Sequence, residues 1–216
     1  MKLSEKQFGN WDIAVRRNLF MPVNRSVPDV AQKRKNWNGL MSGFKASDLV
    51  FLDESGCNTD MTRRYAYSLG VSRAVDSAPL SKPKNTTILS SIKLDGTLRY
   101  TTFSGGTTVE RFKRYLKTVL LPYLNGNSVL VMDNMKSHHA KTVKNLLNGS
   151  GVRYIYLPPY SPDLNPIEKL WWKVKAFLRK FKARTLDALL NAIQCAFQAV
   201  SPSDCSGWFK SRDYLH

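Results

Sequence analysis

The 216-residue sequence is poor in acidic residues, in cysteine and in histidine. Asp and Glu number 16 against 33 Lys and Arg, which leaves a net charge of +17. Three cysteines, Cys57, Cys195 and Cys205, are an odd number without a C-x-x-C pair, which argues against a disulfide framework or a structural zinc site. The adjacent His138 and His139 lack the i, i+4 spacing of a zinc-binding helix.

The sequence also lacks an apolar run of membrane-spanning length and a signal-peptide pattern at its start. We therefore expect an intracellular protein with no membrane partner. Its 43% hydrophobic residues are enough for a normal core. A folded chain with this excess of positive charge predicts a polyanionic partner, for which nucleic acid is the leading class.

Three regions differ in composition. Residues 1–47 hold nine Lys and Arg against three acids and are interpreted as a basic arm or linker that ends in a short helix, "DVAQKRKNWNGLM". Its basic side chains could either contact DNA or form a solvated helix face. Residues 48–183 are predicted to form one α/β domain, and residues 184–216 a C-terminal helix and tail packed on it.

The order of the predicted elements defines the fold class. "LVFLDESG" and "SVLVMDN" are short apolar runs that end in an acid, typical of buried strands. "TTILSSIKL" and "LRYTTFSGG" flank Asp95-Gly96, a strong hairpin signal, and "RYIYLP" is a fifth strand. Helical periodicity marks the segments between and after the last strands. We predict an α/β protein with a five-stranded mixed sheet, formed by a three-strand antiparallel meander plus two parallel strands and flanked by helices.

Three carboxylates stand at predicted ends of elements. Asp53 and Asp133 are expected to terminate the first and fourth strands, and Glu168 begins the helix after the fifth. Because ligands gather at strand ends in open α/β sheets, these side chains are expected to converge. Three carboxylates suffice to hold two Mg²⁺ ions that act on a phosphodiester.

Each acid also has a structural alternative. Asp53 and Asp133 fit turns, and Glu54 competes with Asp53, although only one of two successive strand residues can face the site. Asp60 and Asp163 are weaker rivals in turn-like segments. Glu168 could simply cap its helix, with Asn165 as the N-cap and Pro166 in the first helical position.

Three blocks of the sequence resemble the catalytic motifs of a known family. "LVFLDESG", "VLVMDNMKSHHA" and "YLPPYSPDLNPIEKLWWKVK" are similar to those of DDE transposases of the mariner superfamily, in its bacterial insertion-sequence branch. Residues 134–167, an interval of 34, separate Asp133 from Glu168, which is the spacing associated with that superfamily.

The resemblance implies an RNase H-like catalytic domain, as in retroviral integrases. It implies that Asp53, Asp133 and Glu168 bind two Mg²⁺ or Mn²⁺ ions for DNA strand cleavage and strand transfer, with insertion at TA sites and a dimer on DNA. Residues at matching positions are expected to support the site: Asn134, His138, Asn165 and Pro166. The DNA contacts are expected among basic residues near the site: Arg63, Arg64, Lys169, Lys173, Lys175, Arg179, Lys180 and Lys182.

The sequence is compatible with two alternatives to an active transposase. One is a catalytically inactive remnant that holds DNA through its charge, and the other is an RNase H-type nuclease, which has no need of the "SPDLNPIE" block. The 52 residues before Asp53 show no paired helix-turn-helix unit. Recognition of transposon ends is therefore expected from an upstream-encoded helix-turn-helix protein or a frameshift fusion, in the bacterial cytoplasm and nucleoid.

Overall fold

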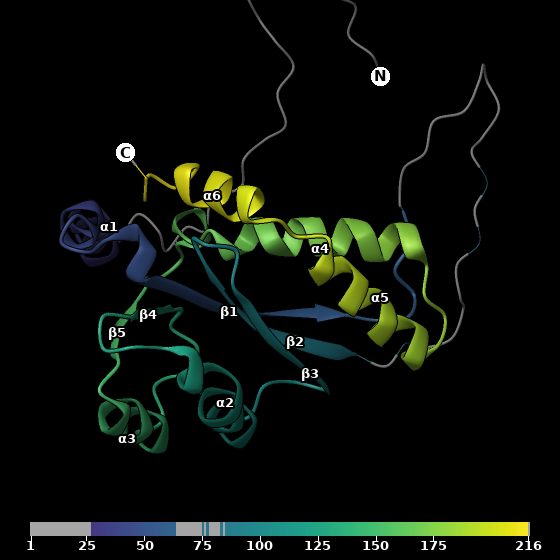
Figure 1. The fold of residues 1–216 in the computed structure, drawn as a ribbon, viewed down its shortest axis with the longest axis horizontal. Helices are drawn as coiled ribbons and strands as arrows, with labels where there is room; N and C mark the ends of the chain where they lie inside the picture. The colour runs from purple at the N-terminus through teal and green to yellow at the C-terminus, as the bar shows by residue number, and fades with distance from the viewer. Residues whose placement is uncertain (1–26, 64–74, 76, 78–82, 84, 216) are drawn as a thin grey trace, which may run out of the picture.

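A five-stranded sheet forms the centre of the described part of the protein (Figure 1). The computed structural model describes residues 27–63, 75, 77, 83 and 85–215. The strands lie in the order β3-β2-β1-β4-β5, with β2 antiparallel to β1 and β3, and β4 parallel to β1 and β5. Their bounds are β1 Leu49–Cys57, β2 Thr86–Lys93, β3 Leu98–Ser104, β4 Val129–Met132 and β5 Arg153–Tyr156. The predicted mixed sheet, with its antiparallel meander and two parallel strands, is confirmed.

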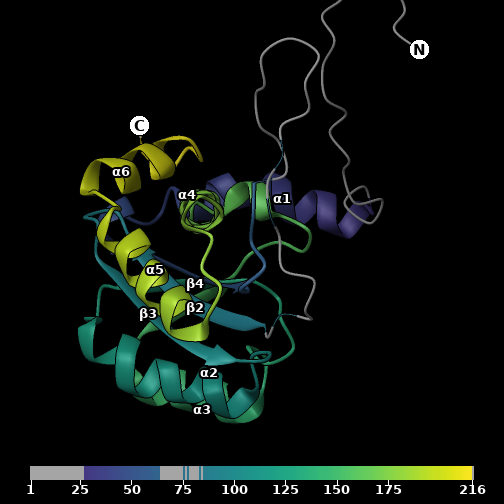
Figure 2. The same cartoon turned by 90° about the vertical axis from the view of Figure 1, so that its right-hand side faces the viewer.

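Helices cover both faces of this sheet (Figures 1 and 2). Residues of α1, α4, α5 and α6 contribute to one hydrophobic core, and residues of α2 and α3 to a second core on the opposite face. The helices are α1 Pro28–Met41, α2 Val109–Tyr115, α3 Lys141–Ser150, α4 Ile167–Phe181, α5 Leu186–Gln198 and α6 Pro202–Lys210. None of the helices in the described ranges is long and apolar enough to cross a membrane.

Strand β1 separates its side chains between the two cores. Leu49 and Phe51 lie in the core under α4, whereas Val50 and Leu52 lie in the core with α2. This alternation continues along the strand, because successive side chains point to opposite faces. Asp53 is consequently directed toward α4, and its neighbour Glu54 toward the opposite face.

The prediction that Asp53 terminates its strand was wrong. β1 continues to Cys57 because the whole stretch pairs with β2, up to the pair Cys57 and Thr86. The parallel partner β4 ends earlier, since its last pair with β1 joins Phe51 and Val131. Asp53 therefore lies just past the end of the parallel pairing, which is where such sheets open to ligands.

The two ends of the described chain meet on the α4 side of the sheet. Trp37 of α1, within the segment predicted as an arm or linker, is 3% exposed and donates from Nε1 to the hydroxyl of Tyr214 at 2.9 Å. Helix α6 was not distinguished in the sequence from the C-terminal tail. Its start is fixed by a capping box between Ser201 and Asp204, with Pro202 in the first turn.

Candidate active site

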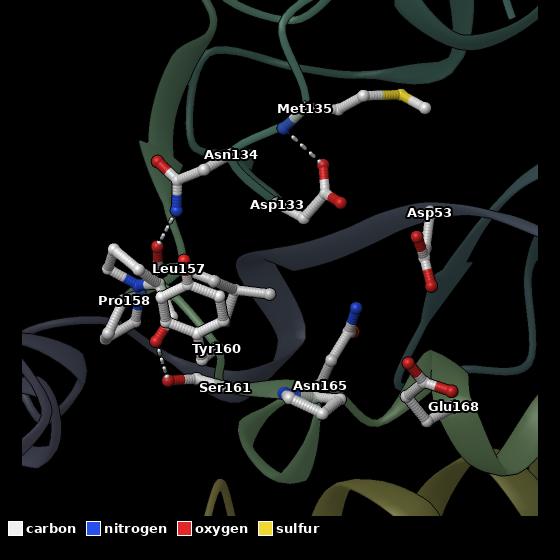
Figure 3. A pocket seen from close by; sticks show the side chains of 12 residues that line it. Asp53, Asp133, Asn134, Met135, Leu157, Pro158, Tyr160, Ser161, Asn165 and Glu168 are labelled. Carbon is white, nitrogen blue, oxygen red and sulfur yellow. Dashed lines mark hydrogen bonds between the residues drawn. The ribbon is translucent and has the colours of Figure 1, made fainter. Parts of the chain in front are cut away.

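Asp53, Asp133 and Glu168 line one cavity of about 440 Å³. Figure 3 shows the three carboxylates directed into the same space, from β1, from the residue after β4 and from the first turn of α4. Residues 157–162, which follow β5, line the other side of the cavity. The three acids, far apart in the sequence, thus line one cavity, although their ligand atoms do not all lie within 4.8 Å of one another.

Asp53 is held by a tryptophan of the facing helix. The indole Nε1 of Trp171 donates to Oδ2 of Asp53 at 3.0 Å. Burial raises the pKa of Asp53 to about 7, and the negative charges of Glu168 and Glu54 act in the same direction. A carboxylate in this environment is costly to ionise without a cation beside it.

Asp133 is held by His138, which also contacts Glu54. Nδ1 of His138 lies 2.8 Å from Oδ1 of Asp133, and Nε2 lies 3.1 Å from Oε1 of Glu54. The imidazole is fully buried and stacks on Phe112, with ring centroids 4.1 Å apart. Groups on the face of the sheet opposite α4 therefore orient Asp133.

The charges of this group are mutually stabilising. Burial acts to lower the pKa of His138, but the hydrogen bonds to Asp133 and Glu54 outweigh it and raise the pKa to about 9. Burial acts to raise the pKa of Asp133, but the His138 hydrogen bond and charge hold it below its ordinary value. The imidazolium form thus donates to a carboxylate from each of its two nitrogens.

Glu168 is half-buried in the first turn of α4. Burial raises its pKa, while the positive charges of Lys175 and Arg212 act in the opposite direction and Asp133 adds to the increase. Within the described ranges its carboxylate accepts no hydrogen bond. The capping interpretation holds for Asn165 but not for Glu168: Asn165 has extended backbone and its side chain accepts from the N–H of Ile167, as an N-cap residue does, and Pro166 has helical backbone before the start of α4 at Ile167.

The remaining predicted support residues fix the backbone around the cavity. Asn165 is 3% exposed, and its Oδ1 accepts from the backbone N–H of Ile167 at 3.3 Å, which sets the entry into α4. Pro166 is buried. Asn134 donates from Nδ2 to the carbonyl of Leu157, which ties the end of β4 to the loop beyond β5.

The loop before α4 is held from outside by two distant elements. Arg34 of α1 donates to both carboxylate oxygens of Asp163, at 3.1 and 2.7 Å, and also to Ser161. The hydroxyl of Tyr214 donates to the carbonyl of Leu164 at 2.7 Å. These contacts fix the wall of the cavity against α1 and the C-terminal segment.

The predicted DNA-contact residues differ in their surroundings. Lys173 pairs with Asp204 and joins α4 to α6, and Arg64 lies outside the described residues. Of the others, three are exposed, Arg63, Lys169 and Lys180, and three are half-buried, Lys175, Arg179 and Lys182.

The donor set of the cavity suits a hard divalent cation. All three side chains offer carboxylate oxygens, the ligands that Mg²⁺ and Mn²⁺ prefer. In the part of the chain that the structure describes, the acids and histidines close enough to share a single ion are Glu54, Asp133 and His138, with ligand atoms within 4.8 Å of one another. In that group His138 directs one nitrogen to each carboxylate, so it serves as their hydrogen-bond donor.

Comparison with known proteins identifies the family. Residues 48–190 match the family model described as DDE superfamily endonuclease. The chain belongs to the DDE superfamily of endonucleases. The matched range includes all three cavity carboxylates and the helix α4 that carries Glu168 and Trp171.

Individual relatives of the chain are transposases. The chain is 29% identical over 97 residues to the Transposable element Tc1 transposase of Caenorhabditis elegans. The alignment covers 43% of this chain and 36% of that protein. The chain thus spans about a third of the length of this curated relative.

Solved structures show the same fold. The Mos1 transposase paired-end complex with left transposon end has a TM-score of 0.80 at 15% identity, covering 96% of this chain and 65% of that one. The Mos1 transposase catalytic domain with Raltegravir and Mg has a TM-score of 0.65 at 16% identity, covering 86% and 90%. The predicted RNase H-like architecture is confirmed by this likeness.

The sequence motifs did not predict four side chains that lie near the cavity: Glu54, Trp171, Arg34 and Arg212. Trp171 carried a recognisable signal, since it lies three residues after Glu168 on the same helix and so on the same face. In the sequence, Glu54 is only an alternative to Asp53. The contacts of Arg34 and Arg212 depend on packing between distant segments, for which a single sequence gives no signal.

Proposed function

We propose that the chain is the catalytic part of a transposase that cleaves DNA at transposon ends and joins the freed ends to target DNA. The observation that supports this most directly is the convergence of Asp53, Asp133 and Glu168 on one cavity in a DDE superfamily endonuclease. The catalytic motifs and the interval between Asp133 and Glu168 favour the mariner superfamily and its bacterial insertion-sequence branch.

Asp53, Asp133 and Glu168 would hold two divalent cations, Mg²⁺ or Mn²⁺. When bound, such ions act as Lewis acids at the attacking and leaving oxygens of a phosphodiester. The raised pKa values of Asp53 and Glu168 fit this use, because crowded carboxylates are stabilised by a shared cation. One solved Mos1 catalytic domain is described with Mg, which fits the same chemistry.

The protein's own side chains position the reacting groups. Trp171 and His138 orient Asp53 and Asp133, while Asn165 and Asn134 fix the backbone on either side of the cavity. Exposed lysines of α4, such as Lys169 and Lys180, would contact backbone phosphates of the bound DNA.

The partners follow from the same proposal. The substrate is double-stranded DNA, first at transposon ends and then at a TA target, with the chain acting as a dimer in the bacterial nucleoid. Residues 48–183 would form the catalytic domain, on which residues 184–216 and helix α1 of the predicted 1–47 segment pack. End recognition would come from an upstream-encoded helix-turn-helix protein or a fusion.

The test is nicking of supercoiled plasmid DNA with Mg²⁺ or Mn²⁺ by the full chain. Asp53→Ala, Asp133→Ala and Glu168→Ala should each abolish nicking and leave DNA retention on a filter intact. Asp187→Ala, which removes an exposed carboxylate at the start of α5, is the matched control and should nick normally. Equal nicking by all four variants would refute the site, and DNA retention without nicking by the wild type would indicate an inactive remnant.

A further inference from the structure

A second cleft begins at Glu168 and runs between α4 and α6. Its volume is about 530 Å³, within the range of pockets that hold small ligands, about 300–1,000 Å³. Figure 1 shows the two helices side by side above the sheet, and the pair Lys173 and Asp204 joins them. Because Glu168 lines this cleft and the carboxylate cavity, the two spaces adjoin.

One wall of the cleft carries an exposed tryptophan. Trp172 is 73% exposed, whereas its neighbour Trp171 is 4% exposed and belongs to the core. An indole this exposed contributes little to folding, so core packing does not account for it. Trp208, from α6, lines the same cleft and is half-buried. Aromatic faces in an otherwise basic surface are the usual platform for unpaired bases.

Positive charge lies beside these rings. Arg212, just after α6, lines the cleft, and its positive charge acts against the rise that burial causes in the pKa of Glu168. Its Nε is buried and, among the residues that the structure describes, has no hydrogen-bond partner. Lys169 is exposed on α4 at the same end of the cleft. Lys173 is already paired with Asp204, so Arg212 and Lys169 are the cations placed to receive a phosphate.

We propose that this cleft binds an unpaired nucleotide of the DNA strand that adjoins the cleavage site. Trp172 stacks on the base, and Arg212 and Lys169 contact the flanking phosphates. In a duplex the bases stack on one another and are not accessible to Trp172, so the cleft selects a strand with local unpairing. This inference rests on the proposed function, because it places the nucleotide next to the catalytic carboxylates.

The experiment measures binding without divalent cations, so its result does not depend on nicking. Two labelled duplexes are compared by fluorescence anisotropy with the full chain, one blunt and one with a short unpaired overhang that carries 2-aminopurine. The wild type should prefer the overhang and quench 2-aminopurine. Trp172→Ala should weaken overhang binding about tenfold, as expected for loss of one stacked base, and leave the blunt duplex unaffected.

Two further variants separate stacking from general charge. Phe181→Ala removes another aromatic of α4, 50% exposed and outside the cleft, and should bind both duplexes as the wild type does. Gly207→Leu should fill the cleft, since a Cβ at Gly207 meets no atom within 4 Å, and should also remove the overhang preference.

Equal affinity of the wild type for both duplexes would overturn the proposal. So would a Trp172→Ala variant that keeps the overhang preference. Neither result would affect the nicking test of the three carboxylates, so a failure here is distinguishable from a failure of the proposed function.

Discussion

Trp171 donates a hydrogen bond from its indole Nε1 to Oδ2 of Asp53, 3.0 Å away. The same helix, α4, supplies Glu168 one turn earlier. One element therefore both contributes the third carboxylate and orients the first. The position of α4 on the sheet consequently controls the geometry of two of the three acids.

Trp171→Phe should lower Mg²⁺-dependent nicking by about 10–100-fold, the usual effect of removing a group that orients a metal ligand. The phenyl ring keeps most of the buried volume, so the protein should remain folded. Nicking rates and Mn²⁺ affinity are to be measured together, with folding checked by circular dichroism. Unchanged Mn²⁺ affinity and unchanged nicking would show that the hydrogen bond is not needed.

Glu54→Gln should also reduce nicking, again by about 10–100-fold, although Glu54 does not line the cavity with the three carboxylates. The reason is that Glu54 holds the imidazole of His138, which in turn holds Asp133. Glu110→Gln replaces an exposed acid of α2 and serves as the control. Full activity of Glu54→Gln would mean that Asp133 is oriented without this contact.

Asp53→Asn should stabilise the metal-free protein at neutral pH. Its folded-state pKa of about 7 lies above the ordinary value of 3.8, so the folded state favours the neutral acid. Ionisation of Asp53 therefore lowers the free energy of unfolding progressively as the pH rises from about 4 and reaches its full effect above about 7. Thermal unfolding at pH 8 in a chelator should show a melting temperature higher by at least about 2 °C.

Asp133→Asn should have the opposite effect on the melting temperature in the same thermal unfolding assay. His138 holds the pKa of Asp133 below its ordinary value. The charged carboxylate therefore stabilises the folded state when the pH is above the ordinary pKa of Asp, and this stabilisation is lost as the pH falls through the lowered pKa. This variant should melt at a lower temperature than the wild type at pH 8. A shift of the same sign in both variants would contradict the assigned charge states.

Arg34 and Asp163 should be energetically coupled. Arg34 is well shielded, with 16% of its side chain exposed, and bonds both oxygens of a carboxylate that is 37% exposed. A double-mutant cycle of Arg34→Ala and Asp163→Ala by urea unfolding should give a coupling of about 1 kcal/mol. Strictly additive effects would show that α1 does not hold the loop before α4.

Local patterns in the sequence were sufficient to predict the strands of the sheet. The apolar run in "LVFLDESG" predicted a buried strand, and the alternation of side chains along a strand predicted that Asp53 and Glu54 point to opposite faces. The Asp95-Gly96 hairpin is present, with Gly96 at a φ of 87°. The end of β1 was mistaken because Ser55-Gly56 is a turn signal, and pairing with β2 across the sheet overrides it.

The connections between side chains could not be predicted in this way. His138 meets Glu54 only because residues 84 positions apart are brought together by the sheet. Arg212 approaches Glu168 only because α6 packs on α4, through Lys173 and Asp204. Such contacts arise from tertiary packing, which local periodicity does not encode.

The most direct test of the central claim is Mn²⁺ binding by electron paramagnetic resonance. The wild type should take up Mn²⁺ at the shared cavity, and Asp53→Ala, Asp133→Ala and Glu168→Ala should each lose it, while Asp187→Ala binds as the wild type does. Undiminished Mn²⁺ binding by all three variants would contradict the account, because Asp53, Asp133 and Glu168 would then not be the ligands.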